Sequence, residues 1–182
     1  MQRRASDPAS LAVPPGAFDL TSAADDALRA AAQAPPRLGY AAHPGFAFVM
    51  ALGGMGWRIA EVCGALGLDF ASGPVLAACR IDWHAGLRTG TRHAVTARVE
   101  GIARRASRSL GAADHLTLRI SVGDAAHVAL RIVFRVPGAV GAAGGVAPPV
   151  EGTVLRRLDP VSAGAMRVWC DLMRDDNAIH TD

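Results

Sequence analysis

The feature that most constrains the fold is a strict alternation of apolar and polar side chains in two neighbouring segments. In the first segment, 115–122, the apolar positions are Leu116, Leu118, Ile120 and Val122. In the second, 127–136, they are Val128, Leu130, Ile132, Phe134 and Val136, and Arg131 and Arg135 alternate with them. A period of two predicts β-strands with one buried and one solvated face. Gly123 and Asp124 lie between the segments, so the pair is predicted to form a hairpin.

Two segments further upstream show the same alternation. Residues 93–101 alternate through Val95, Ala97 and Val99. Residues 79–83 place Cys79, Ile81 and Trp83 on one side and Arg80 and Asp82 on the other. Together, the four segments predict an antiparallel sheet with one face in water.

A long apolar run precedes these strands. His43-Pro44-Gly45 opens the stretch FAFVMALGGMGWRIAEVCGALGL, which would make about six turns as one helix. Gly53, Gly54 and Gly56 lower its helix propensity, so tertiary packing must hold it, and a closely approaching sheet would supply that packing. A buried helix followed by an antiparallel meander predicts an α+β fold in which the sheet wraps around a central helix.

The flanking segments are less regular. Residues 1–16 are rich in Pro, Ala and Ser and predict a disordered leader, with order beginning at Phe18. Thr21, Ser22 and Asp25 form an N-terminal capping pattern for a short helix that ends before Pro35. Residues 139–152 have the Gly, Ala and Pro content of a linker. After it, Asp159 or Ser162 can cap a last helix that ends near Arg174, with its apolar positions at Val161, Ala165, Val168, Trp169, Leu172 and Met173.

Composition excludes several classes of protein. Apolar residues make up 51% and charged residues 19%, as in a globular domain. The net charge is only +3, and the 19 basic residues, all arginine, are spread along the chain without interleaved aromatics, which argues against nucleic-acid binding. No apolar run is long enough for a membrane span, and Cys63, Cys79 and Cys170 form no CxxC motif, which argues against a disulfide framework or a zinc site. A cytoplasmic location is expected.

The sequence ends in RDDNAIHTD, directly after the last predicted helix. Asp175, Asn177 and His180 are spaced D-x-N-x-x-H, and this segment resembles the signature of the MaoC-like (R)-specific enoyl-thioester hydratases and dehydratases, a D-x-N-P-I-H-x-D type of sequence. The positions that match are Asp175, Asn177, Ile179, His180 and Asp182. Ala178 stands where proline is usual and Arg174 where glycine is usual, and neither departure removes a reactive group.

The resemblance extends upstream through HPGFAF and RIDWHAGLRTG and implies the hot-dog fold. It is similar to the family members with two hot-dog repeats, in which an N-terminal repeat without the motif widens the acyl pocket. On that basis residues 17–138 would be the motif-free hot-dog domain. Residues 153–182 would be only the opening of a second repeat, whose central helix and sheet are missing. The resemblance therefore implies completion by a hot-dog partner, in a homo- or hetero-oligomer.

The resemblance also implies the chemistry. His180 would remove the α-proton of a 3-hydroxyacyl thioester, while Asp175 would hold or protonate the hydroxyl group and Asn177 would fix the geometry. Asp182, with His43 and Gly45 at the start of the central helix, would help to bind the substrate. That substrate would be carried on coenzyme A or an acyl carrier protein, and no metal or redox cofactor would be needed.

Several alternatives remain open from the sequence. RDDNAIHTD can be a solvated tail, His43 and His84 can be structural, and the chain can be a non-catalytic pocket or scaffold subunit, or a truncated fragment of a longer dehydratase. Glu61 would suit a hot-dog thioesterase, since some of these enzymes use a helix carboxylate. Two groups of arginines either meet carrier phosphates or form a solvated rim: Arg104, Arg105 and Arg108 upstream of the predicted hairpin, and Arg156 and Arg157 after the linker.

Overall fold

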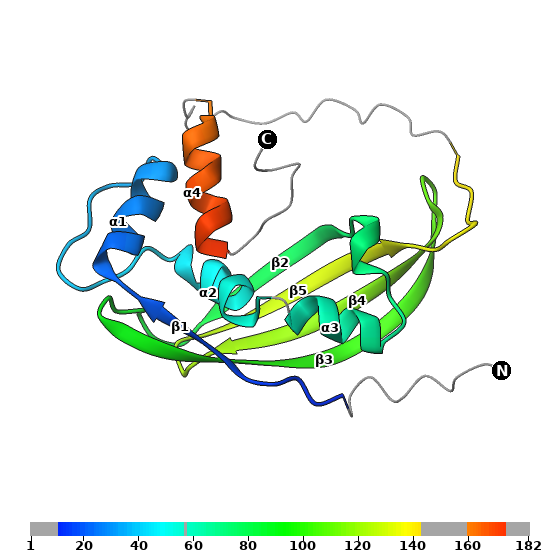
Figure 1. Ribbon diagram of the computed structural model, residues 1–182, viewed down its shortest axis with the longest axis horizontal. Coiled ribbons are helices and arrows are strands. Elements are labelled where there is room, and N and C mark those ends of the chain that lie inside the picture. Colours follow the sequence, from blue (N-terminus) through cyan, green and yellow to red (C-terminus); the bar gives the residue numbers. More distant parts are fainter. Residues whose placement is uncertain (1–10, 57, 143–159, 174–182) are drawn as a thin grey trace.

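The alternating segments form one antiparallel sheet of five strands. The computed structural model describes residues 11–56, 58–142 and 160–173. The strands are β1 (Gly16–Leu20), β2 (Val75–Trp83), β3 (Thr91–Ser107), β4 (Gly111–Val122) and β5 (Ala126–Arg135). Their order across the sheet is β1-β3-β4-β5-β2, which places β1 and β2 at the edges (Figure 1). The predicted antiparallel sheet and the α+β class are confirmed.

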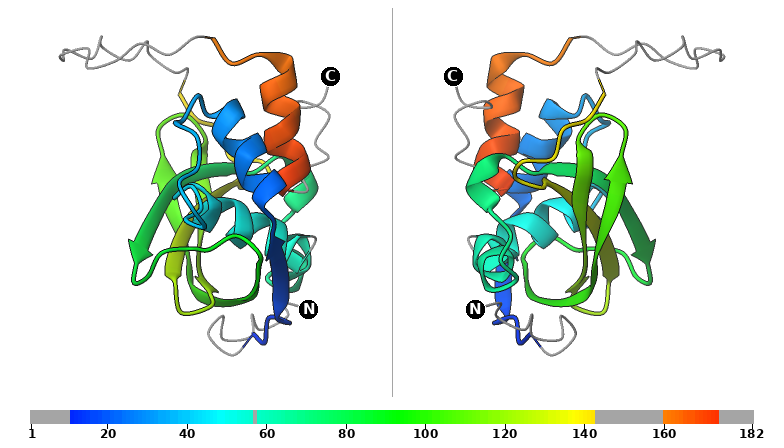
Figure 2. Two further views of the ribbon diagram at one scale, coloured as in Figure 1. Left: turned by 90° about the vertical axis from the view of Figure 1, so that its left-hand side faces the viewer. Right: turned by 90° about the vertical axis from the view of Figure 1, so that its right-hand side faces the viewer.

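The helices lie against one face of this sheet. They are α1 (Ser22–Ala31), α2 (Phe46–Met55), α3 (Arg58–Ala65) and α4 (Ala163–Met173), and a short 3-10 turn, η2 (Phe70–Ser72), follows α3. The central helix α2 packs on β1, β3, β4 and β5, and the sheet curves around it (Figure 2). Helix α4 packs beside α1 and α2, although α1 and α4 are far apart in the sequence (Figure 1).

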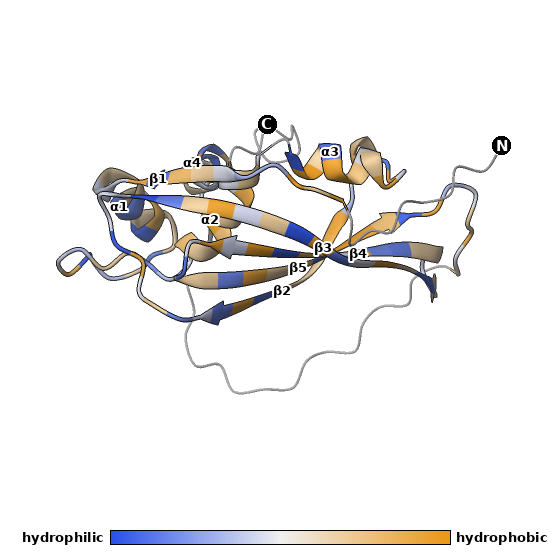
Figure 3. Cartoon of the chain, turned by 90° about the horizontal axis from the view of Figure 1, so that it is seen from below, coloured by the Kyte–Doolittle hydropathy of each residue, from blue (hydrophilic) through white to orange (hydrophobic). Residues whose placement is uncertain are grey.

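The period-two pattern predicts burial well in β4 and β5. Leu116, Leu118, Ile120 and Val122 of β4 are at most 1% exposed, and Val128, Leu130, Ile132 and Phe134 of β5 are also buried. Arg131 and Arg135 are exposed, as expected. Hydrophobic and hydrophilic residues alternate visibly along the strands in Figure 3. The hairpin turn at Gly123 is confirmed by its positive φ of 49°.

The prediction of one long central helix is wrong. The run divides into α2 and α3, which meet at an angle of 65°. The break lies at Gly56, whose φ of 51° belongs to the left-handed region that a side chain rarely adopts. The expected close approach of the sheet is real: a Cβ on Gly54 would lie 2.6 Å from Cγ2 of Val95 on β3. Within the described ranges no single helix has the length and apolar character to cross a membrane, and only the bent pair α2–α3 reaches that length.

The strand β1 was not predicted. Its five residues pair antiparallel with the start of β3, from Gly16 opposite Val95 to Leu20 opposite Thr91. Phe18 and Leu20 enter the core, and Leu11 and Val13, which fall within the expected leader, also pack against it. The pattern of this segment is too short to separate a strand from a loop, because its partner lies about 75 residues away.

Candidate active site

The D-x-N-x-x-H motif follows α4 directly in the chain. Ser162 caps this helix, as one of the two predicted alternatives: its Oγ accepts a hydrogen bond from the backbone N–H of Ala165 at 3.1 Å. On the inner side of the helix Trp169, Leu172 and Met173 pack against the core and Cys170 is buried. Four predicted site residues, Asp175, Asn177, His180 and Asp182, lie outside the described residues.

Helix α4 meets the central helix without an intervening side chain. The backbone of Gly53 on α2 lies so close to α4 that an added Cβ would be 2.7 Å from the carbonyl oxygen of Leu172. The same Cβ would also contact the ring of Phe18, at 3.1 Å. Gly53 therefore allows the last turn of α4 to lie directly against the central helix.

The other two predicted site residues, His43 and Gly45, lie together at the start of α2. The backbone N–H of Gly45 donates a hydrogen bond of 3.0 Å to Nδ1 of His43. A Cβ on Gly45 would be 2.9 Å from that nitrogen, so only glycine leaves room for the ring. Because Nδ1 accepts this bond, the proton of the neutral imidazole is on Nε2.

A buried carboxylate fixes this corner. Asp25 on α1 is fully buried, and its Oδ1 accepts a hydrogen bond of 2.6 Å from the backbone N–H of His43. Its Oδ2 accepts a bond of 2.8 Å from Nε of Arg29, and Nε of Arg37 lies 3.6 Å away. Two paired cations and a backbone donor offset the cost of burying this charge.

Arg29 also holds the loop that joins the two helices. Its two terminal guanidinium nitrogens donate to the carbonyl oxygens of Pro35 at 3.0 Å and Ala41 at 3.2 Å. Burial, followed by the charge of Arg29, lowers the pKa of His43, while the charge of Asp25 raises it. His43 is therefore neutral at pH 7, as a hydrogen-bond donor through Nε2 and not as a cation.

Sequence reasoning missed the part that Asp25 plays. It was assigned to a capping pattern, but the cap is Thr21, whose Oγ1 accepts from the N–H of Ala24 at 3.1 Å. The available signal was Arg29 four residues after Asp25, the spacing of an ion pair on one helix face. Most such pairs lie on the surface, and the burial of Asp25 depends on a loop that returns 18 residues later.

Other reactive groups are poorly placed for catalysis. Burial raises the pKa of the Cys63 thiol to about 11, so it is protonated at neutral pH and is a weak nucleophile. Glu61, the carboxylate of the thioesterase alternative, is exposed on α3, beyond the break in the central run. In the part of the chain that the structure describes, no three His, Cys, Asp or Glu side chains gather as metal ligands would.

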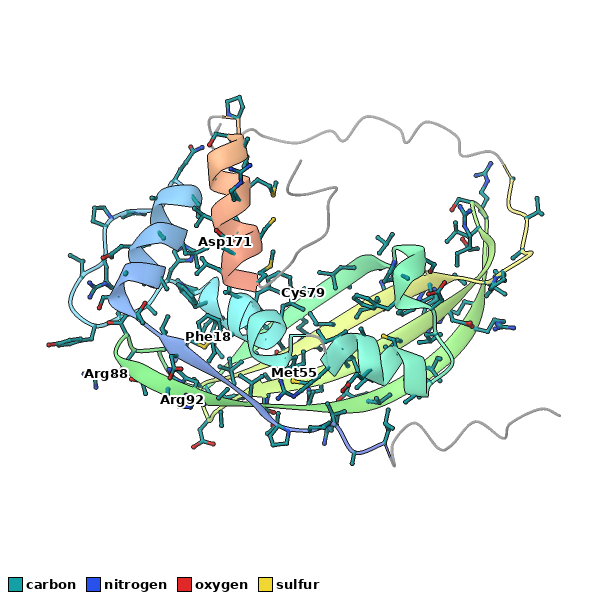
Figure 4. The ribbon with its side chains drawn as sticks, viewed as in Figure 1. Phe18, Met55, Cys79, Arg88, Arg92 and Asp171 are labelled. Atoms are coloured by element: carbon teal, nitrogen blue, oxygen red, sulfur yellow. The ribbon has the colours of Figure 1, made fainter. Side chains whose placement is uncertain are left out.

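The edge strand β2 is exposed on its inner side. Cys79, Ile81 and Trp83 pair in register with Leu130, Val128 and Ala126 of β5, so they are on the same face as the core. Cys79 is nevertheless exposed (Figure 4), and Trp83 and Leu76 are 41% and 43% exposed. The predicted alternation is correct, but the expected burial is absent because α2 packs on the other four strands.

The sequence matches no protein-family profile, and no curated protein matches it significantly. Solved structures do match. HtdX of Mycobacterium tuberculosis is similar over 93% of this chain, with a TM-score of 0.58 and 19% identity. A MaoC-like dehydratase of Phytophthora capsici is similar over 97%, with a TM-score of 0.61 and 13% identity. The chain spans 64% and 66% of the length of these two proteins.

A third similar structure is a complex. It is the C-terminally truncated HadBC (3R-hydroxyacyl-ACP dehydratase) complex of Mycobacterium tuberculosis, with a TM-score of 0.50 and 10% identity over 71% of this chain and 98% of that one. At these identities the similarity establishes the architecture. The chain therefore has the hot-dog fold, and it shares that fold with MaoC-like dehydratase structures.

Proposed function

We propose that the protein is part of a hydratase or dehydratase that acts on 3-hydroxyacyl or 2-enoyl thioesters of coenzyme A or an acyl carrier protein. The observation that carries this proposal is the position of the motif in the chain. D-x-N-x-x-H begins two residues after Met173, the last residue of helix α4, and α4 packs against the central helix of a hot-dog domain. The hot-dog structures of dehydratases provide the matching architecture.

The proposed chemistry needs a base and an acid. In dehydration, His180 takes the α-proton, the bond between C3 and its hydroxyl oxygen breaks, and the hydroxyl leaves as water after accepting a proton from Asp175. Hydration reverses these steps, and Asn177 and Asp182 position the reacting groups. His43 and Gly45 are proposed to line the acyl pocket. Neutral His43 then offers its Nε2–H as a hydrogen-bond donor. Because it carries no charge, it does not repel His180 when that residue becomes protonated.

A hot-dog partner is proposed to complete this site at β2. Among the described strands β2 is paired on its β5 side alone, and its inner face carries exposed Leu76, Cys79 and Trp83 and half-buried Ile81. An unpaired edge beside exposed apolar side chains is suited to pairing with a strand of another subunit. HadBC, a similar structure, is itself a complex of hot-dog proteins.

The test is hydration of a short 2-enoyl-CoA, followed by loss of the conjugated enoyl absorbance, with the protein purified together with the subunits that it binds. We expect activity in the wild type, and a decrease of at least about a hundredfold in His180→Ala, since an acid–base group contributes about 10²–10⁴ in rate. His84→Ala, which alters an exposed histidine, is the matched control and should retain activity. A silent wild type would contradict the catalytic assignment and favour the non-catalytic subunit.

A further inference from the structure

The face of the sheet that points away from α2 is strongly basic. In β2 to β5 the side chains that alternate with the buried ones lie on this outer face. Its arginines are Arg80, Arg92, Arg98, Arg105, Arg119, Arg131 and Arg135, and its carboxylates are Asp82 and Glu100, with Asp19 of the neighbouring strand β1 opposite Arg92. Positive charge is thus in excess on this face, although the net charge of the whole chain is only +3.

The carboxylates of this face are already occupied, and Asp19 lies 3.1 Å from Arg92. Asp82 accepts a bond of 2.8 Å from Nε of Arg80. Glu100 lies 3.3 Å from Arg98 and 3.2 Å from Arg119, which stand directly opposite each other on β3 and β4. Like charges in directly opposite positions destabilise a sheet, so this arrangement costs the fold free energy.

The remaining three arginines have no such compensation. Arg105, Arg131 and Arg135 are exposed, and none of them forms an ion pair with another of the described residues. Arg105 and Arg135 flank Ala113 from β3 and β5, so they lie in one row across the sheet. Their guanidinium groups are available to an external partner.

Two hollows lie between these side chains. One, of about 260 Å³, is lined by Thr96, Arg98, Arg119, Ser121 and His127. The other, of about 230 Å³, is lined by residues that include Arg105, His115, Thr117 and Arg131. Four strands about 4.8 Å apart and a length of about ten residues give a surface of about 600 Å², close to one side of a standard protein interface. The size fits a macromolecule.

The chemistry of the face selects among macromolecules. A second copy docked face to face would bring two arginine-rich surfaces together and is disfavoured by repulsion. The outward positions of β2 to β5 hold no Phe, Tyr or Trp. The face therefore lacks the aromatic side chains on which nucleic-acid bases stack and those that insert into a membrane surface. Guanidinium groups, in contrast, bind carboxylates through paired hydrogen bonds. We propose that this outer face is a docking surface for an acidic protein that presents several Asp and Glu side chains.

The probe for this proposal is a fluorescein-labelled poly-L-glutamate peptide of about 20 residues, titrated with the protein and followed by anisotropy at an ionic strength where the Debye length is about 10 Å. The test variant is Arg105→Ser with Arg131→Ser. The control is Arg88→Ser with Arg167→Ser, two exposed arginines outside the outer face, of which Arg88 lies at the end of the molecule near α1 (Figure 4). Both variants lower the net charge from +3 to +1.

We expect the outer-face variant to bind the peptide at least about tenfold more weakly, and the control to change less than about twofold. Equal losses in the two variants would show a response to net charge alone and would overturn the proposal, as would an absence of binding by the wild type. Tighter binding of a DNA duplex or of phosphatidylglycerol vesicles, with the same dependence on Arg105 and Arg131, would also overturn it. Circular dichroism checks folding, and single Arg131→Ser against Arg88→Ser repeats the comparison if the double variant is unstable. These outcomes are independent of enoyl hydration.

Discussion

The carboxylate of Asp25 accepts a hydrogen bond of 2.6 Å from the backbone N–H of His43 and so ties α1 to the start of the central helix α2. The bond spans 18 residues, and the side chain of Asp25 is fully buried. It fixes where the central helix begins, and with it the orientation of the His43 ring. One acidic side chain therefore connects α1, the following loop and the start of α2.

Replacing Asp25 should be costly. Asp25→Ala leaves Arg29 and Arg37 without their shared partner and leaves the His43 N–H unpaired, so the free energy of unfolding should fall by about 3 kcal/mol. Urea denaturation measures this change. Asp26→Ala is the matched control, since the side chain of Asp26 is 57% exposed and its ion pair with Arg37 lies at the surface, and it should cost less than about 0.5 kcal/mol. Equal losses for the two variants would contradict the role of Asp25.

Two glycine substitutions on neighbouring helices should act in opposite directions. In Gly54→Ala the new Cβ meets Cγ2 of Val95 at 2.6 Å, so overpacking should lower the free energy of unfolding by about 1–3 kcal/mol. In Gly64→Ala the Cβ meets nothing within 4 Å, so the gain in helix propensity should raise it by about 0.5 kcal/mol. Thermal unfolding compares them, and adding Val95→Ala should restore part of the loss in Gly54→Ala. A rise in the free energy of unfolding for Gly54→Ala as well would show that α2 does not lie this close to β3.

The lowered pKa of His43 predicts a pH dependence of stability. A histidine whose pKa is lower in the folded state binds a proton more readily when unfolded, so its neutral form is favoured by folding. The stabilisation is complete above the unfolded pKa of about 6.5 and is lost progressively as the pH falls below it, towards the folded pKa. His43→Asn keeps an acceptor for the Gly45 N–H but cannot titrate in this range.

The stability of the wild type relative to His43→Asn should therefore decline between pH 7.5 and pH 5. Urea denaturation of both proteins across this range gives the difference, in which the contributions of the other histidines cancel. A difference that stays constant with pH would show that the His43 ring is as well solvated in the folded protein as in the unfolded chain.

The open edge of β2 predicts where a partner binds. Leu76→Lys places a charge on the exposed inner side of this strand and should weaken association with a hot-dog partner at least about tenfold, because charged side chains at an edge oppose strand pairing. The comparison variant is Leu38→Lys, at a leucine that is 86% exposed and distant in sequence from β2, which should leave association unchanged. Sedimentation velocity detects the complex as a species heavier than the 18.8 kDa monomer. Association that survives Leu76→Lys would place the partner elsewhere.

The sheet could be predicted from sequence because its signal is local and repeated. Leu118 and Ile132 each lie in a run where every second residue is apolar, and burial of one face is enough to fix such a register. The break at Gly56 could not be predicted, because three nearby glycines each permit a left-handed φ and tertiary packing decides which one adopts it. The pairing of β1 with β3 and the burial of Asp25 depend on contacts between distant segments, which periodicity does not report.

The candidate site also has a part that the sequence predicts and a part that only the structure reveals. Asp175, Asn177 and His180 are predicted from the resemblance of their segment to the MaoC-like signature, and these residues lie outside the described part of the chain. For His43 and Gly45 the sequence indicated the start of a helix, and the structure adds the contact between them and the neutral state of the imidazole. The outer arginines are too widely spaced in sequence to appear as a cluster, and only the pairing of four strands brings them onto one surface.

The most direct measurement of the proposed function is the position of the oxygen atom that the protein adds to a 2-enoyl-CoA in water enriched in oxygen-18. Mass spectrometry of the products locates the label. We predict a 3-hydroxyacyl-CoA with the label on C3 and the thioester intact, and no such product from His180→Ala. Label in a free carboxylic acid, with release of coenzyme A, would contradict the account and identify a thioesterase. No labelled product from the protein with its bound subunits would contradict it as well.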